Sequence, residues 1–330
     1  MFDAFFAGFL LVVQWPTIGY LLLGMALGIW FGAVPGLGGI LGMVILLPFT
    51  FKMDPVAAFA MLLALYAVTS TSDSITAVML GIPGTVASQA TILDGYPLAK
   101  QGQASRALGA AFSVSAFGGV FGAVLLAVSL PVIQPFILAF GAPEIFMLGL
   151  MGLVMVGLLS GRSLAKGIVA ALFGILLSTI GYAEAVAVPR YWFNTTYLLD
   201  GLPLVPAVLG FFALPELLDL ATRNVSISQI PKDQAGGGGM MGGVRDAIRH
   251  WWIVLRCSAI GTYIGMLPGL GAAIADWVAY GHVVQTSKDK SRFGHGDIRG
   301  VIGPESANNA TRGGELIPTV AFGVPGSVGS

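Results

Sequence analysis

Two stretches of the sequence, Gly28-Ile-Trp-Phe-Gly-Ala-Val-Pro-Gly-Leu-Gly38 and Gly261-Thr-Tyr-Ile-Gly-Met-Leu-Pro-Gly-Leu-Gly271, carry the same pattern of glycine and proline. Position 28 corresponds to 261 and position 38 to 271, so the offset is 233 residues throughout. Later in each half, Gly81-Ile-Pro-Gly-Thr85 is matched by Gly323-Val-Pro-Gly-Ser327. A lone Pro-Gly in an apolar run is usually only a kink, whereas two motif pairs in the same order predict an internal repeat.

The composition indicates a protein whose solvent is lipid. Hydrophobic residues make up 56% of the chain and charged residues 10%, and the mean hydropathy is +0.86, whereas soluble domains carry about 25% charged residues. The net charge of zero gives no reason to expect a nucleic-acid partner. The single cysteine, Cys257, excludes an internal disulfide, and no histidine has a partner at ligand spacing, so no metal site is predicted.

Seven apolar segments have the length or near-length that a membrane span requires, which is about 20 residues in a helix. Two of them, Gly19–Phe51 and Trp251–Val284, are interrupted by the Pro-Gly-Leu-Gly motifs. We therefore expect an all-α polytopic integral membrane protein with broken or re-entrant helical hairpins. The five uninterrupted segments are Val56–Leu80, Ala107–Leu130, Pro143–Ser160, Gly167–Tyr182 and Thr196–Leu218.

Basic residues alternate between the loops, which predicts the orientation. Lys100 and Arg106 lie in one loop, and the loops Pro131–Ala142 and Ala183–Thr195 are poor in charge. Loops rich in Lys and Arg are typically cytoplasmic. Both flanks of Trp251–Val284 are basic, so this segment is expected to enter and return from inside; two very short full crossings are the alternative. Because five spans separate the interrupted segments, their mouths should open on opposite faces, as in inverted-topology repeats.

A polar, Gly-rich stretch, Asn224–Gly243, is the best boundary in the chain and reads as a flexible cytoplasmic loop. It divides the chain into a first membrane repeat with its following helices (1–223), the loop (224–243) and a second repeat (244–330).

Broken helices mark the predicted substrate site. In transporters with inverted repeats the site lies near the midplane, where freed backbone amides and carbonyls face the substrate and the coupling ion. We expect an anion to bind at the two breaks and along the later motifs. The predicted substrate-binding residues are Pro35, Gly36, Leu37, Gly38, Gly84, Thr85, Ser88, Pro268, Gly269, Gly271, Asn308, Asn309, Arg312, Gly326 and Ser327.

Asp73 lies in an otherwise uncharged stretch, where a carboxylate costs ~2.5–3.5 kcal/mol on insertion scales. We predict that it binds the coupling ion or carries a proton, with the hydroxyls of Ser70, Ser72 and Ser74 as further oxygen ligands for Na⁺. The alternative is that the stretch bends to an interface and Asp73 only caps a helix. No other cofactor is expected. Arg312 could bind a substrate carboxylate or pair with Glu305 or Glu315.

Three stretches resemble the large membrane subunit of the tripartite tricarboxylate transporters, the TctA type. They are Gly81-Ile-Pro-Gly-Thr-Val-Ala-Ser-Gln-Ala-Thr-Ile-Leu-Asp-Gly-Tyr-Pro-Leu-Ala-Lys-Gln-Gly102, Gly303-Pro-Glu-Ser-Ala-Asn-Asn-Ala310 and Leu316-Ile-Pro-Thr-Val-Ala-Phe-Gly-Val-Pro-Gly326. The similarity covers essentially the whole chain. It implies a bacterial inner-membrane permease that works with a small membrane subunit and a periplasmic solute-binding protein. It also implies uptake of tricarboxylates or related organic carboxylates, driven by a Na⁺ or H⁺ gradient.

The chain departs from the family pattern at three places. Family members continue with further helices beyond the position of Ser330, and many are richer in Gly where this chain has Thr69–Ser74. Small residues are common in the family where this chain has Arg312 after Asn308-Asn309. A passive channel and a non-transporting membrane scaffold remain as alternatives. An enzyme is not expected, because the sequence has no Walker A motif and no arrangement of Ser, His and Asp for nucleophilic catalysis.

Overall fold

The computed structural model describes residues 2–34, 37–138, 141, 143, 146–147, 150, 164–183, 188–199, 201–202, 218, 239–267, 271–327 and 329–330. Within these residues the chain is almost entirely helical. The exception is a two-stranded antiparallel hairpin, in which β1 (Gly181–Ala183) pairs with β2 (Val188–Arg190). The predicted all-α class is therefore correct except for this hairpin, where Gly181 leaves the helical region at φ 108°.

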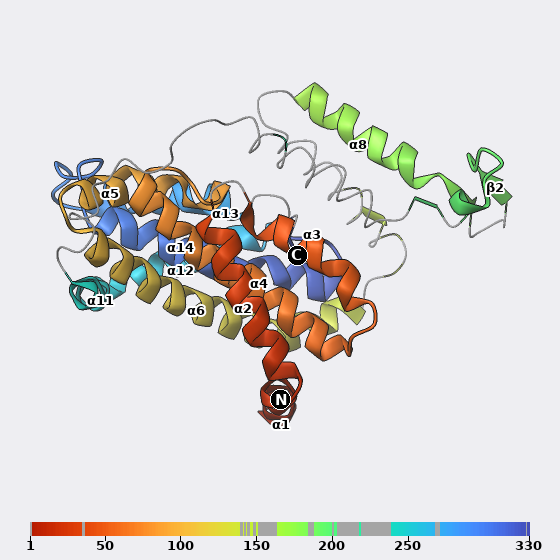
Figure 1. Cartoon of the computed structure of the whole chain (residues 1–330), viewed down its shortest axis with the longest axis horizontal. Helices are drawn as coiled ribbons and strands as arrows, with labels where there is room; N and C mark the ends of the chain where they lie inside the picture. The colour runs from red at the N-terminus through yellow and green to blue at the C-terminus, as the bar shows by residue number, and fades with distance from the viewer. Residues whose placement is uncertain are drawn as a thin grey trace.

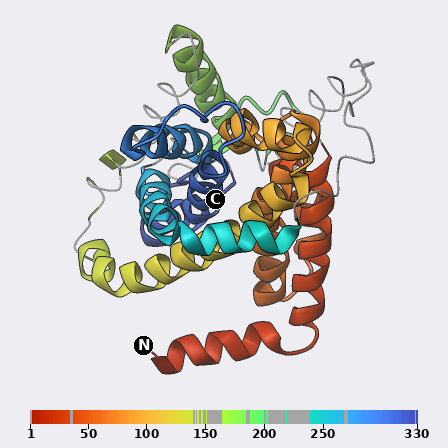
Figure 2. The same cartoon turned by 90° about the vertical axis from the view of Figure 1, so that its left-hand side faces the viewer.

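The N-terminal half begins with α1 (Phe2–Val13), α2 (Thr17–Ala33) and α3 (Gly38–Thr50). Figure 2 shows the sharp turn between α1 and α2, whose axes differ by 76°. Pro16 stands at this turn, where its missing N–H costs no helix hydrogen bond.

The next helix, α4 (Pro55–Leu80), has clear start and stop signals. The Asp54 side chain accepts a hydrogen bond from the Val56 N–H at 2.9 Å, and Pro55 occupies the first turn. The helix ends at Gly81, which adopts a left-handed conformation at φ 66°. Its neighbour α2 lies so close that a Cβ on Gly28 would be 2.6 Å from the Leu65 carbonyl oxygen.

A short 3₁₀ turn, η1 (Val86–Ser88), leads into α5 (Gln89–Lys100) and the long α6 (Ala104–Leu138). The predicted loop from Pro131 was wrong at its start, because α6 continues through Pro131 and Pro135 as far as Leu138. Proline is compatible with an apolar helix of this kind when local adjustments satisfy the freed carbonyls. Further on lie α8 (Leu164–Ser178) and the 3₁₀ turn η2 (Thr196–Leu198).

The C-terminal half consists of α11 (Met240–Arg249), α12 (Trp251–Gly265), α13 (Gly271–Thr286) and α14 (Arg299–Phe322). Helix α14 contacts α4, α5, α6, α12 and α13, so it forms the centre of the bundle (Figure 1). Most of its residues from Gly300 to Ala321 are buried.

The structure supports the membrane assignment. Among the described residues, two helices are long and apolar enough to cross a bilayer, Pro55–Leu80 and Ala104–Ile133, and α1 with α2 would make a third if the bent pair is one span. Two predicted spans, Val56–Leu80 and Ala107–Leu130, coincide with these helices. Helix α8 replaces the predicted Gly167–Tyr182 span and has only 15 residues. The predicted spans Pro143–Ser160 and Thr196–Leu218 lie mostly outside the described residues.

The two halves of the predicted domain division pack directly on each other. Helix α6 lies against α11 and α14, and Arg106 Nε forms an ion pair with Asp246 Oδ2 at 2.6 Å. Residues 224–238 of the predicted loop lie outside the described residues, and its last four residues, from Met240, already belong to α11.

Candidate functional site

The candidate site lies where α4 and α14 cross. Polar contacts join the two helices over their central turns, and they show the relative direction of the helices. Each step toward the C-terminus of α4 meets a residue nearer the N-terminus of α14, so the helices run antiparallel where they touch. In order along α4, the contacts are Tyr66 Oη to Glu315 Oε2 at 3.1 Å, Asn308 Nδ2 to the Ser70 carbonyl at 3.1 Å, and Ser74 Oγ to Glu305 Oε2 at 2.7 Å.

Asp73 is fully buried in α4. Its Oδ2 accepts hydrogen bonds from the Thr85 hydroxyl at 2.5 Å and from Asn308 Nδ2 at 3.5 Å. Among the described residues, Asp73 Oδ1 and Asn308 Oδ1 have no hydrogen-bond partner. Buried polar atoms are nearly always paired, so two free oxygens on neighbouring side chains indicate a place for a cation or a proton.

The serines predicted beside Asp73 separate into different contacts. Ser70 remains at the crossing, because its carbonyl accepts from Asn308 and from Asn309 Nδ2, each at 3.1 Å. Ser72 faces α2 instead and donates to the Gly28 carbonyl at 3.0 Å, while Ser74 donates to Glu305. Residues of a helix that are one or two positions apart point in different directions, so a run of consecutive hydroxyls cannot all face one ion.

Arg312 forms an ion pair with Glu315, with 3.2 Å between Nη1 and Oε2. Its guanidinium carbon also lies 4.3 Å from the centre of the Tyr66 ring. The Tyr66 hydroxyl contacts Arg312 Nη1 and lies 3.3 Å from Ser327 Oγ. Of the alternatives stated for Arg312, the structure has the pairing with Glu315. Tyr66 was not predicted from the sequence, since nothing near it in the chain marks it.

Two further buried acids were also missed. Glu305 accepts hydrogen bonds from the hydroxyls of Ser74 and Thr91, both at 2.7 Å, and of Ser115 at 3.3 Å. Asp276 in α13 accepts from the Ala90 N–H at 2.7 Å through Oδ2, and its Oδ1 has no partner among the described residues. Asp276, like Asp73, is a carboxyl within an apolar segment, which is the signal that could have identified it. Glu305 lies in a polar stretch and has no such signal.

The tips of the two Pro-Gly-Leu-Gly breaks lie outside the described residues, including Pro35, Gly36, Pro268 and Gly269. Leu37 precedes α3. Gly38 and Gly271 begin the second arm of each interrupted segment at φ 64° and 63°, a conformation that favours glycine. A Cβ on Gly271 would lie 3.9 Å from Glu315 Oε1, so this break lies beside the Arg312 ion pair.

The two later Pro-Gly motifs pack in the same way, one against Asp73 and the other against Glu315. A Cβ on Gly84 would lie 2.7 Å from the Asp73 Cα, and one on Gly326 would lie 2.7 Å from the Glu315 Cα. Position 73 thus corresponds to 315 and position 84 to 326, at an offset of 242. Ser88 is buried and donates to the Thr85 carbonyl at 3.1 Å, so it closes the turn that holds Thr85 against Asp73.

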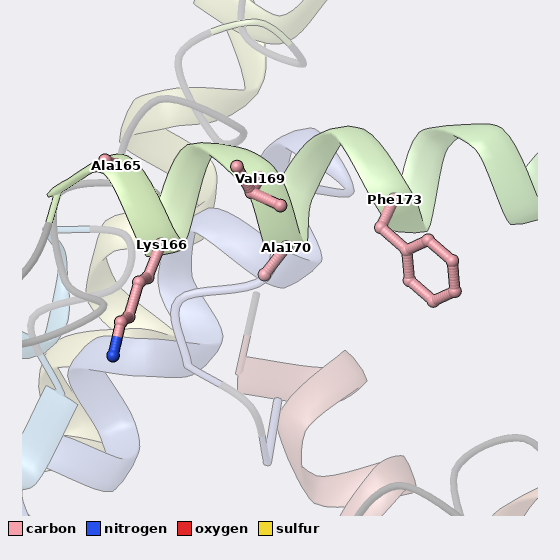
Figure 3. A pocket seen from close by; sticks show the side chains of 5 residues that line it. All are labelled: Ala165, Lys166, Val169, Ala170 and Phe173. Carbon is pink, nitrogen blue, oxygen red and sulfur yellow. The ribbon is translucent and has the colours of Figure 1, made fainter.

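A surface hollow lies elsewhere, along α8 (Figure 3). Its lining residues Ala165, Lys166, Val169, Ala170 and Phe173 come from one helix, and Lys166 is the only charged side chain among them. Ligand sites usually combine polar groups that converge from several elements. The crossing of α4 and α14 has this property and the hollow beside α8 does not.

Comparison with known proteins decides the family. Residues 18–330 match the family described as Tripartite tricarboxylate transporter TctA family. The chain belongs to the TctA family. This membership confirms the resemblance, and the family is one of membrane transporters.

Two similar proteins come from Agrobacterium vitis. One, described as an uncharacterized 52.8 kDa protein in the TAR-I ttuC' 3' region, is 33% identical over 313 residues, which are 94% of this chain and 61% of the relative. The other, described as an uncharacterized protein in the TAR-II ttuC' 3' region, is 45% identical over 65 residues, which are 20% of this chain and 27% of the relative. The TctA chain thus spans about three fifths of the length of the first relative. No solved structure matches this chain.

Proposed function

We propose that this TctA-family chain forms the permease part of a secondary transporter that takes up tricarboxylates or related organic carboxylates. In this proposal it lies in a bacterial inner membrane and works with a small membrane subunit and a periplasmic solute-binding protein. The observation that carries the proposal is the polar crossing of α4 and α14, where buried acids, asparagines and one arginine meet inside an apolar bundle. Intramembrane groups of this kind usually mark ion and substrate pathways.

The contacts at the crossing support an inverted repeat. At the offset of 242 residues, Tyr66 corresponds to Asn308 and Asp73 to Glu315. Tyr66 contacts Glu315, and Asn308 contacts Asp73, so the same relation is made twice with the two halves exchanged. The helix packing repeats as well, because Gly28 lies against Leu65 of α4 while Gly261 lies against Ala307 of α14. Together with the antiparallel crossing, this is the arrangement expected of two copies related by a two-fold axis in the membrane plane.

A difference between the two copies supports a mobile cation at Asp73. Near Glu315, the guanidinium of Arg312 supplies the positive charge. The position that corresponds to Arg312 in the first copy is Ser70, which brings no charge. The Oδ1 atoms of Asp73 and Asn308 have no hydrogen-bond partner within the described part of the chain. We therefore assign Asp73 to the coupling ion, Na⁺ or a proton.

The substrate is expected beside this ion. An organic anion could take the place of Glu315 on Arg312, since a guanidinium binds carboxylates through two parallel hydrogen bonds. Asn309 lies next to this position and accepts a hydrogen bond from Thr71 at 3.3 Å. Filling the Asp73 site removes a negative charge from the neighbourhood, and this favours entry of the anion.

The test is uptake by the full-length transporter in proteoliposomes with its binding protein. Asp73→Asn should abolish accumulation against a gradient, whereas Asp289→Asn, in the exposed loop after α13, should leave it unchanged. Accumulation that ignores both Na⁺ and pH gradients in the wild type would contradict ion coupling. Flux that only equilibrates the substrate, without the binding protein, would instead support a passive channel. If neither the wild type nor Asp73→Asn moved substrate, and Asp73→Asn bound substrate as well as the wild type, the result would support a non-transporting scaffold.

A further inference from the structure

The buried acids at the centre of the bundle are not equally satisfied. Glu315 has Arg312 as its counter-ion, and Glu305 accepts three hydroxyl hydrogen bonds. Asp73 and Asp276 each have one oxygen that is bonded and one that has no partner among the described residues, although both side chains are fully buried. An ionised carboxylate inside an apolar bundle is costly unless a positive charge accompanies it. Of these four acids, only Asp73 and Asp276 have a buried oxygen with neither a hydrogen bond nor an ion pair among the described residues.

One short segment joins the two unsatisfied acids. Thr85 donates its hydroxyl hydrogen bond to Asp73 in α4, and the N–H of Ala90 binds Asp276 in α13. Only four residues separate these donors, and they include the 3₁₀ turn η1 (Val86–Ser88). The segment from Thr85 to Ala90 therefore spans between a helix of the first half and an arm of the second interrupted segment. The same short segment therefore donates a hydrogen bond to each of the two carboxyls.

We propose that Asp276 is a second site for a monovalent cation, Na⁺ or a proton, and that the Thr85–Ala90 segment makes the two sites fill together. The inference rests on the proposed function and extends it, because it sets at least two positive charges for each carboxylate molecule moved. The free Oδ1 of Asp276 is the atom that receives the charge. The Oδ2 atom keeps the segment in place through Ala90.

The deciding measurement is the number of charges that accompany each substrate molecule. The reversal potential of the full-length transporter in proteoliposomes gives this number for Na⁺ and protons together, and binding of radioactive ²²Na⁺ to the purified subunit gives the Na⁺ share alone. The wild type should move at least two cations with each substrate molecule. Asp276→Asn should move one cation fewer. The amide keeps an oxygen for the Ala90 N–H, so the segment remains anchored. Asp289→Asn is the matched control and should equal the wild type.

A second variant separates the link from the site. Ala90→Pro removes the N–H donor, and proline is tolerated in the first turn of α5. It should keep both cations but lower the Hill coefficient for the cation toward one. A wild-type ratio of one cation per substrate would overturn the proposal even if Asp276→Asn failed to fold. An unchanged ratio in Asp276→Asn with a reduced ratio in Asp73→Asn would overturn the second site alone. No cation dependence in the wild type would overturn the proposed function as well.

Discussion

At the scale of single residues, the site depends on which carboxyl oxygens already have hydrogen-bond donors. Asp73 would have been a plausible helix cap from the sequence alone, because Ser and Thr surround it. Its complete burial in the middle of α4 removes that alternative. The sequence identified Asp73 because a single charge in an apolar run is conspicuous. The sequence could not show that Tyr66 and Glu315 are hydrogen-bonded to each other, since these two residues are 249 positions apart in the chain.

Thr85 offers a test at this scale. Replacing it with valine keeps the shape of the side chain but removes the hydroxyl that donates to Asp73. A hydrogen bond to a charged group contributes about 1.5–3 kcal/mol, so we expect the apparent cation affinity to change by at least about tenfold. The measurement is the cation concentration that gives half-maximal uptake. Thr85→Ser keeps the hydroxyl and should stay close to wild type; equal effects of the two substitutions would mean that the hydrogen bond is not the cause.

At the scale of elements, local signals fixed some helix ends and tertiary contacts fixed others. The prediction for α4 began at Val56 and the helix begins at Pro55, because Asp54 and Pro55 form a recognisable start. The predicted span Ala107–Leu130 ends eight residues before α6 does, because the helix continues through Pro131 and Pro135 to Leu138. The neighbours of α14 include five other helices, α4, α5, α6, α12 and α13, and no local pattern contains that information.

The close packing of α2 on α4 gives a prediction for an element pair. In Gly28→Ala the new methyl group would lie 2.6 Å from the Leu65 carbonyl oxygen, so the two helices must move apart. Overpacking of this kind costs about 1–3 kcal/mol, and we expect a clearly lower melting temperature of the purified protein. Gly281→Ala is the control, because nothing lies within 4 Å of its added Cβ. If the melting temperature fell equally in both variants, the lower stability of Gly28→Ala would not come from the contact between α2 and α4.

At the scale of the whole molecule, the question is whether the two halves enter the membrane from opposite faces. The antiparallel crossing of α4 and α14 argues for it: if the halves are copies in the same order, then corresponding helices that run antiparallel place the halves upside down relative to each other. Lys52 follows the first interrupted segment and Lys288 follows the second, and both are exposed.

Cysteine labelling in oriented membrane vesicles tests this directly, because the natural Cys257 is fully buried and should react little. A membrane-impermeant thiol reagent should label Lys52→Cys only from outside and Lys288→Cys only from inside. Arg245→Cys, on the basic side that precedes α12, should label with Lys288→Cys, since α12 and α13 are expected to return to the face from which they enter. If Lys52→Cys and Lys288→Cys reacted from the same side, the halves would not be inverted. The correspondence of Tyr66 with Asn308 and of Asp73 with Glu315 would then need an origin other than an inverted duplication. The assignment of Asp73 to the coupling ion rests on comparing it with the Arg312–Glu315 pair, so this assignment would lose its basis.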